Sequence, residues 1–209
     1  MKKHLNALLK YWGMIEDANE WEDAEYTPEY KTKLTAGHDV LYMFDDEEEG
    51  ITYVVCTGTN WSFREWASNL WAWPFRGFHR GFYKTAKKFF DQLKDMWLPF
   101  NRKVVIIGHS RGVYSVILAY LMNNAGMWDK PHCITFGAPE FAKGKGRKKL
   151  NKSDVTHDRC YTEDDIVVGL GASKYWATKN IKLASIKGFD HTKYGQVILE
   201  TMRIEEEAR

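Results

Sequence analysis

A short apolar run that leads into a glycine-flanked serine constrains the fold of this chain more than any other feature. Residues 104–107 read Val-Val-Ile-Ile, an unbroken β-branched run that predicts a strand buried on both faces. Gly-His-Ser-Arg-Gly follows at residues 108–112, and residues 113–121 are apolar enough for a buried helix. A strand, a G-x-S-x-G pattern and a helix in this order are typical of a nucleophile elbow, with Ser110 exposed on a turn that the two glycines make possible.

Strand and helix signals alternate along the rest of the chain. Runs rich in β-branched and aromatic residues predict strands, and apolar residues at helical spacing predict helices. This alternation favours an α/β domain with a central, mostly parallel sheet flanked by helices, and 209 residues fit a single domain spanning 1–209. The predicted elements are a helix at 3–15, a hairpin of strands at 38–44 and 51–56 around a charged turn at 45–50, a helix at 83–97, strands at 131–136 and from 155, and a final helix at 196–204.

Composition narrows the classes of partner. The net charge of +2 is too close to balance to indicate nucleic-acid binding. The three cysteines (Cys56, Cys133 and Cys160) are sparse and unpaired in spacing, which predicts reduced thiols and no disulfide framework. The sequence shows no signal peptide and no apolar run of membrane-spanning length, so we expect a cytoplasmic protein without a transmembrane segment. The basic run at 143–152 predicts an exposed loop or helix end, with contact to a lipid surface as the alternative.

A serine nucleophile needs a histidine base, and the chain order of the triad selects one. In a fold with this elbow the order is serine, then an acid, then histidine. Four histidines lie beyond residue 108. His109 belongs to the elbow itself, where we expect it to face away from the chemistry. His132 sits in the strand that opens at Pro131, and His157 precedes the best acids. His191, in a loop before the last helix, is therefore the predicted base.

The acid and the oxyanion donors are the remaining parts of such a site. Asp164 and Asp165 both lie at a strand end, where the acid belongs, whereas Asp190 abuts the histidine and does not readily reach its ring. A tetrahedral oxyanion needs donors aimed at it. The backbone N–H of Arg111, directly after the serine, is one, and Thr59 after an earlier strand is placed to supply another. No metal or organic cofactor is implied, since the cysteines and histidines lack zinc spacing.

Across about residues 50–195, the chain resembles the class 3 lipase family, the fungal-type triacylglycerol lipases and their esterase and phospholipase relatives within the α/β-hydrolases. Five stretches match the family's motifs in order; they are Val-Cys-Thr-Gly-Thr at 55–59, His-Arg-Gly-Phe at 79–82, the elbow at 108–112, Thr-Phe-Gly-Ala-Pro at 135–139, and Asp-Ile-Val at 165–167. Asp190-His191 followed by Tyr194 resembles the family's histidine motif. The resemblance implies that Asp165 is the triad acid, that Thr59 is an oxyanion donor, and that His79 is structural.

The chain departs from the family pattern at three positions. Thr57 stands where members usually have arginine, and Asn69 where the lid segment usually has aspartate, so both charges of one ion pair are absent together. Val168 replaces the proline that follows Asp-Ile-Val. These departures bear on the substrate more than on the catalytic groups.

The function expected from these features is that of a serine carboxylester hydrolase acting on acylglycerols or similar lipid esters. The aromatic-rich segment 61–74, including Trp61, Trp66, Trp71 and Trp73, suits either a core-facing helix or a lid that presents apolar surface to substrate. A small-ester or aryl esterase, a phospholipase A, and a catalytically silent binding module are the alternatives. The expected partner is a lipid or ester substrate, with peripheral contact to a lipid interface.

Overall fold

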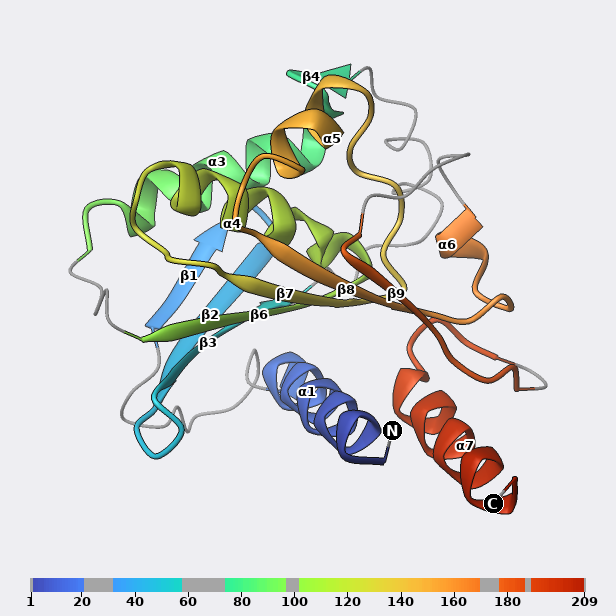
Figure 1. Ribbon diagram of the computed structural model, residues 1–209. Helices are drawn as coiled ribbons and strands as arrows, with labels where there is room; N and C mark the ends of the chain where they lie inside the picture. Colours follow the sequence, from blue (N-terminus) through green and yellow to red (C-terminus); the bar gives the residue numbers. More distant parts are fainter. Residues whose placement is uncertain are drawn as a thin grey trace.

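A seven-stranded sheet organises the described part of the chain (Figure 1). The computed structural model describes residues 2–20, 32–57, 74–96, 102–169, 177–186 and 189–208. The strand order is β1-β2-β3-β6-β7-β8-β9; β1, β2 and β3 pair antiparallel, and β3, β6, β7, β8 and β9 pair parallel. The strands are β1 Thr32–Ala36, β2 Asp39–Asp46, β3 Ile51–Thr57, β6 Lys103–His109, β7 His132–Phe136, β8 Thr156–Tyr161 and β9 Lys179–Lys182.

Helices cover both faces of this sheet. Figure 1 shows α3, α4 and α5 on one face, and α1 and α7 on the other. The helices are α1 Lys2–Glu20, α3 Arg80–Leu93, α4 Tyr114–Asn124 preceded by a 3-10 turn Ser110–Val113, α5 Lys145–Leu150, α6 Ile166–Gly169 and α7 Tyr194–Glu207. The mostly parallel sheet flanked by helices confirms the predicted fold class.

Alternation along the central strand divides the core between these two helical layers. On β6, Val104 and Ile106 belong to the core beneath α3 and α4, while Val105 and Ile107 belong to the core beneath α1 and α7. Successive strand residues point to opposite faces, so a strand covered on both sides must be apolar throughout. The run at 104–107 is buried for this reason.

The predicted hairpin forms, and the sheet also has two edge strands that the sequence does not predict. β2 and β3 pair antiparallel through the charged turn at 47–50, as predicted. β1 and β9 carry Thr-Lys-Leu-Thr-Ala and Lys-Asn-Ile-Lys, which show little apolar alternation. Because a sheet's edge strands are commonly charged and partly exposed, their sequences gave no clear strand signal.

A small hairpin precedes α3. β4 Pro74–Phe75 and β5 Phe78–His79 are joined by Arg76 and Gly77, both with positive φ, the backbone that a tight two-residue hairpin turn requires. The basic run predicted as a loop or helix end forms α5, and its Gly146 packs against Gly77 so closely that a Cβ on either glycine would lie within 2.2 Å of the other's backbone.

Within the described ranges, no helix is both long enough and apolar enough to cross a bilayer. Cys56, Cys133 and Cys160 are free and buried, as the prediction of reduced thiols requires. Burial raises the pKa of each thiol, which leaves these cysteines protonated and unreactive.

Candidate active site

Ser110 lies in a strained turn at the carboxyl end of β6. Its φ is +53°, a left-handed backbone that non-glycine residues adopt rarely and mostly at functional sites. Two glycines make the turn possible. A Cβ on Gly108 would lie 2.5 Å from the carbonyl oxygen of Gly112, and a Cβ on Gly112 would lie 2.4 Å from the carbonyl oxygen of Cys56. The predicted elbow is therefore present, and both of its glycines are sterically required.

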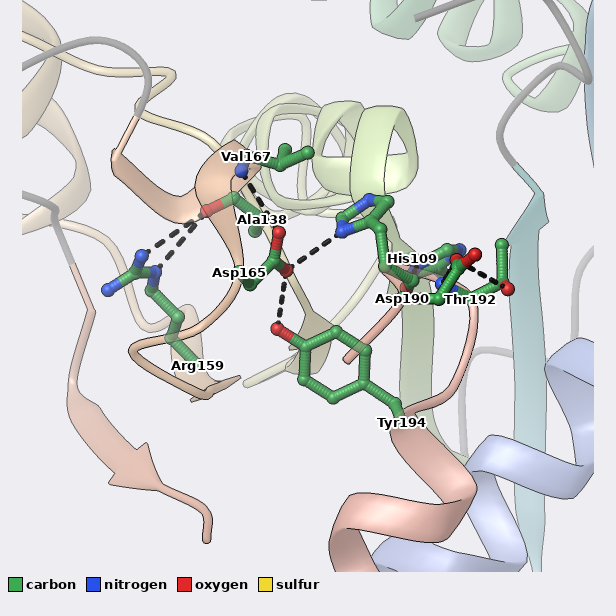
Figure 2. A network of polar contacts seen from close by, with 9 residues as sticks. His109, Ala138, Arg159, Asp165, Val167, Asp190, Thr192 and Tyr194 are labelled. Atoms are coloured by element: carbon green, nitrogen blue, oxygen red, sulfur yellow. Dashed lines mark hydrogen bonds and ion pairs between the residues drawn. The ribbon is translucent and has the colours of Figure 1, made fainter. Parts of the chain in front are cut away.

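Asp165 and His191 meet at the same edge of the sheet. His191 Nδ1 lies 2.8 Å from Asp165 Oδ2, and the carboxylate side chain has no solvent exposure. The Tyr194 hydroxyl donates to the same oxygen at 2.7 Å, and the backbone N–H of Val167 donates to Oδ1 at 2.9 Å. Figure 2 shows these three contacts converging on the carboxylate. Three donors hold a buried acceptor in one orientation, which is what a residue that orients an imidazole requires.

This contact assigns the tautomer of the histidine. The carboxylate accepts hydrogen bonds, so the proton sits on Nδ1 of His191 and the other ring nitrogen, Nε2, carries the lone pair. Nε2 is buried and has no hydrogen-bond partner within the described residues. A buried, unpartnered imidazole nitrogen is ready to take a proton from a substrate or nucleophile.

The surroundings of Gly137 explain why the Thr-Phe-Gly-Ala-Pro stretch has a glycine at this position. Its φ is +58°, and a Cβ there would lie 2.6 Å from His191 Cε1 and 2.7 Å from Asp165 Oδ2. Any larger residue would displace the histidine–carboxylate pair. The residues just beyond β7 thus form one wall of the site.

His109 corrects one sequence-based expectation. We expected its ring to face away from the chemistry, but it packs against the ring of His191 with centroids 4.6 Å apart. Its Nε2 also lies 2.9 Å from the backbone carbonyl oxygen of His191 and therefore donates. Burial, and then the neighbouring His191, lower the pKa of His109 to about 3, so the ring is neutral at physiological pH. The residue before the serine holds the histidine loop in place.

Helix α1 supports this loop from below. The Trp12 ring contacts the rings of His109 and Tyr194, with centroids 5.1 Å and 5.7 Å apart. Its indole is fixed by a 2.7 Å hydrogen bond to Glu16. A Cβ on Gly195 would lie 2.8 Å from Trp12, so the start of α7 approaches α1 closely. The helical spacing at 3–15 predicts this helix but does not connect it to the site.

A buried ion pair anchors the residue after the serine. Arg111 Nε and Nη2 donate to the two carboxylate oxygens of Asp39 at 2.6 and 3.0 Å, and this bonding raises the pKa of the guanidinium. The Thr85 hydroxyl donates to Asp39 at 2.8 Å. The Asp39 side chain is 2% exposed and that of Arg111 27%. The pair joins the elbow to the start of β2 and, through Thr85, to α3. Asp39 belongs to no recognisable motif, so the sequence does not indicate its role.

Two of the positions at which the chain departs from the family pattern, Thr57 and Val168, make local hydrogen bonds in the structure. Thr57, in the position of the usual arginine, is buried and donates its hydroxyl to the carbonyl of Val40 at 3.4 Å. The Tyr114 hydroxyl donates to the same carbonyl at 3.0 Å. Val168, in the position of the usual proline, donates its backbone N–H to the carbonyl oxygen of Asp165 at 3.1 Å; a proline has no such N–H.

The remaining predicted residues are the alternative acids, the structural histidine and the residues outside the described ranges. Asp164 is exposed, unlike Asp165, and Asp190 instead accepts hydrogen bonds from Thr192 at the start of the histidine loop. His79 accepts from the N–H of Phe82 as the cap of α3. The structure therefore brings together Ser110, Arg111, Asp165 and His191. Thr59, Asn69, Trp61, Trp66, Trp71 and Trp73 lie outside the described residues.

A comparison with known protein families gives a match over the central part of the chain. The model of the family described as "Lipase (class 3)" matches residues 53–173, more than half of the chain. A comparison with curated proteins gives no match.

Solved structures share the fold. The lipase of Rhizopus microsporus var. chinensis is 17% identical with a TM-score of 0.65, over 81% of this chain and 70% of that one. Lipase II of Rhizopus niveus is 18% identical with a TM-score of 0.65, over 81% and 76%. The triacylglyceride lipase of Rhizomucor miehei is 18% identical with a TM-score of 0.64, over 88% and 82%. The family match, together with the shared α/β-hydrolase fold, shows that this chain belongs to the class 3 lipase family of carboxylic ester hydrolases.

Proposed function

We propose that this hydrolase cleaves acylglycerols or similar lipid esters, with Ser110 as nucleophile, His191 as general base and Asp165 as the acid that orients it. The observation that carries the proposal is the bond between Asp165 and His191 Nδ1, formed directly beside the elbow. The His191 ring packs on His109, the residue that precedes Ser110. His191 Nε2 is left without a partner among the described residues.

The first half of the proposed reaction makes an acyl-enzyme. Ser110 Oγ attacks the ester carbonyl carbon while its proton passes to His191 Nε2. The imidazolium that forms is stabilised by Asp165 across the 2.8 Å bond. The backbone N–H of Arg111, with Thr59 as the second donor, stabilises the negative oxygen of the tetrahedral intermediate. Collapse breaks the ester bond, and the imidazolium returns its proton to the departing alcohol.

The second half uses the same groups on water. His191 Nε2 accepts a proton from a water molecule that attacks the acyl-enzyme carbonyl. The second tetrahedral intermediate then collapses: its bond to Ser110 Oγ breaks, the imidazolium of His191 returns the proton to Oγ, and the carboxylic acid leaves. No bond in this sequence needs an additional cofactor.

The neutral state of His109 favours this proton transfer. Each half-reaction places a positive charge on the imidazole of His191, 4.6 Å from the centre of the His109 ring. A protonated His109 at this distance would oppose that charge. Because burial keeps the pKa of His109 at about 3, the neighbour stays neutral and still donates to the His191 backbone.

Family membership and the aromatic-rich sequence support lipid esters as substrates. Five of the thirteen residues at 61–73 are aromatic, and side chains of this kind offer a large apolar surface to an acyl chain. One fungal lipase with the same fold was described in terms of interfacial activation, which is a property of that protein.

Active-site labelling tests the catalytic assignment. A fluorophosphonate should label the wild-type protein and the Ser153→Ala control, whose serine lies far along the chain on the loop after α5, but not Ser110→Ala. Asp165→Asn should lower turnover by roughly 10⁴-fold because the tautomer of His191 is no longer fixed. Equal labelling of Ser110→Ala and wild type would overturn the assignment. No turnover at all in wild type would favour a silent binding module.

A chain-length series of p-nitrophenyl esters tests the substrate. Lipid-ester specificity predicts kcat/KM that rises from acetate to longer acyl chains. Activity confined to acetate would instead identify a small-ester or aryl esterase, and release of fatty acid from phospholipid but not from acylglycerol would identify a phospholipase A.

A further inference from the structure

Two segments of this chain are rich in lysine and arginine and hold no acidic residue. Residues 74–88 contain five such cations, and residues 141–153 contain six. The first segment comprises the β4–β5 hairpin and the first turns of α3, and the second contains α5. The chain as a whole is nearly balanced at +2, so these segments concentrate positive charge that is offset elsewhere on the molecule.

Backbone contacts join the two segments into one surface. The N–H of Lys143 donates to the carbonyl oxygen of Gly77 at 2.9 Å, and the N–H of His79 donates to that of Phe141 at 2.8 Å. The Lys149 ammonium donates to the carbonyl oxygen of Arg76 at 3.4 Å. Figure 1 shows the hairpin and α5 together at the top of the molecule, on the side of the sheet that α3 covers. We call this the basic surface; it comprises Arg76, Arg80, Lys84, Lys87, Lys88, Lys143, Lys145, Arg147, Lys148 and Lys149.

Most of these cations are available to a partner. Lys87 pairs with Asp91, and Lys143 pairs with Glu140. Within the parts of the chain that the structure describes, no carboxylate pairs with the exposed cations Arg80, Lys84, Lys88, Lys145 and Lys148. An array of exposed charges of one sign without partners is costly to the fold through self-repulsion, and such arrays are typical of surfaces that bind anions.

An aromatic cavity opens within the basic surface. Its volume is about 570 Å³, and the aromatic side chains of Phe75 and Tyr83 line it together with Arg80, Lys84, Thr85, Lys87 and Lys88. Phe75 is 44% exposed, and the Arg76 guanidinium lies over its ring at 5.4 Å. Large exposed aromatics beside cations are typical of interfacial membrane contacts, where the ring enters the headgroup region and the cations meet lipid phosphates.

The cavity also touches the polar contacts that reach the candidate active site. Thr85 lines it, and the hydroxyl of the same residue donates to Asp39, which holds Arg111. One side chain therefore separates the basic surface from the ion pair behind the elbow. A lipid surface bound here would lie against the same helix that anchors the elbow.

We propose that the basic surface docks this enzyme onto membranes that contain anionic phospholipids, with Phe75 entering the headgroup layer and the cavity receiving a lipid headgroup. Membrane docking extends the proposed function and rests on it in one respect: the bound membrane would also present the ester substrate. The positive charge of the surface and the exposed ring beside it together favour a lipid surface over nucleic acid.

Vesicle co-sedimentation of the full chain tests the docking. Wild-type protein should bind phosphatidylcholine vesicles that contain phosphatidylglycerol much more tightly than pure phosphatidylcholine. Raising NaCl from about 0.1 M to about 0.5 M should weaken this binding, because salt screens exposed charges. The variant Arg80→Gln/Lys84→Gln/Lys88→Gln should bind about 100-fold more weakly, since each cation near an anionic surface contributes about five-fold.

A matched variant controls for net charge. Lys3→Gln/Lys103→Gln/Lys179→Gln removes the same charge from exposed positions on α1, β6 and β9 and should bind like wild type. Phe75→Ala should weaken binding several-fold, whereas Leu199→Ala, which removes an exposed apolar side chain of α7, should not. Unchanged turnover of a soluble short ester would show that the variants are folded. A second variant, Lys145→Gln/Lys148→Gln, reports on the α5 half of the surface.

The outcomes test membrane docking and ester hydrolysis separately. Equal losses in the α3 variant and its control, equal binding to neutral vesicles, or binding of duplex DNA as tight as that of anionic vesicles would overturn lipid docking. Ester turnover that persists in any of these cases leaves the proposed function standing. Anionic-vesicle binding by a protein that hydrolyses no ester would leave docking standing and overturn the proposed function.

Discussion

Breaking the ion pair behind the elbow should destabilise the protein by an amount that depends on which partner is removed. Asp39 is 2% exposed and Arg111 27%. Arg111→Met leaves a buried carboxylate that, among the described residues, keeps the Thr85 hydroxyl as its side-chain donor, and we expect a loss of about 3–5 kcal/mol in the free energy of unfolding. Asp39→Ala leaves a guanidinium that still reaches water, so we expect a smaller loss of about 1.5–3 kcal/mol.

The double variant separates the pair from the rest of the fold. Asp39→Ala/Arg111→Met leaves no buried charge without a partner. Its loss should therefore be smaller than the two single losses taken together, by about 2–3 kcal/mol of coupling. Urea unfolding followed by tryptophan fluorescence measures all three variants against wild type.

A surface pair supplies the matched control. Arg203 pairs with Glu200 on α7 at an exposed site, where coupling should be far smaller than across the buried pair because solvent screens the two charges. An Asp39→Ala loss as large as that of Arg111→Met, or losses from the two buried changes that simply add, would contradict this expectation.

Three further changes probe the histidine loop. Gly137→Ala should lower kcat by about 10²-fold or more, since its Cβ would displace His191; steady-state kinetics showing wild-type kcat would contradict the steric argument. Tyr194→Phe removes the 2.7 Å hydrogen bond to Asp165 and should cost about 1.5–3 kcal/mol of stability in urea unfolding, with a loss under about 0.5 kcal/mol counting against it. The pKa of His109 is lowered from 6.5 to about 3, so between these pH values the unfolded state binds more protons than the folded state. The contribution of His109 to stability is therefore present above pH 6.5 and is lost as pH falls toward 3, by up to about 1.4 kcal/mol per pH unit. His109→Phe should flatten this dependence in unfolding curves taken from pH 7 to 4, and an unchanged slope would refute the assignment.

Sequence patterns predicted the parts of this fold whose signals are local. The elbow, the β2–β3 hairpin and the apolar strand at 104–107 each depend on consecutive residues, and each is present. The assignment of Asp165 over Asp164 came from a resemblance, and the structure places only Asp165 against the histidine.

Contacts between distant residues escaped prediction. Asp39 and Arg111 are 72 residues apart, and a single aspartate at the start of a strand has no pattern that distinguishes a buried partner from a turn residue. The same holds for His109, whose neighbours in sequence do not indicate that a loop 82 residues later packs on its ring. The order of residues along the chain was enough to predict His191 as the base, whereas the residues that hold it in place, such as His109, are set by packing between distant segments.

The packing of Trp12 against His109 and Tyr194 has a consequence for how activity arises during synthesis. The serine elbow is translated before the base, because His191 follows His109 by 82 residues. Trp12 on α1 reaches its partner on α7 only after Tyr194 has been made and α7 has folded. Hydrolytic activity should therefore appear only once α1 and α7 have packed together, and a nascent chain that already carries Ser110 should hydrolyse no ester before that contact forms.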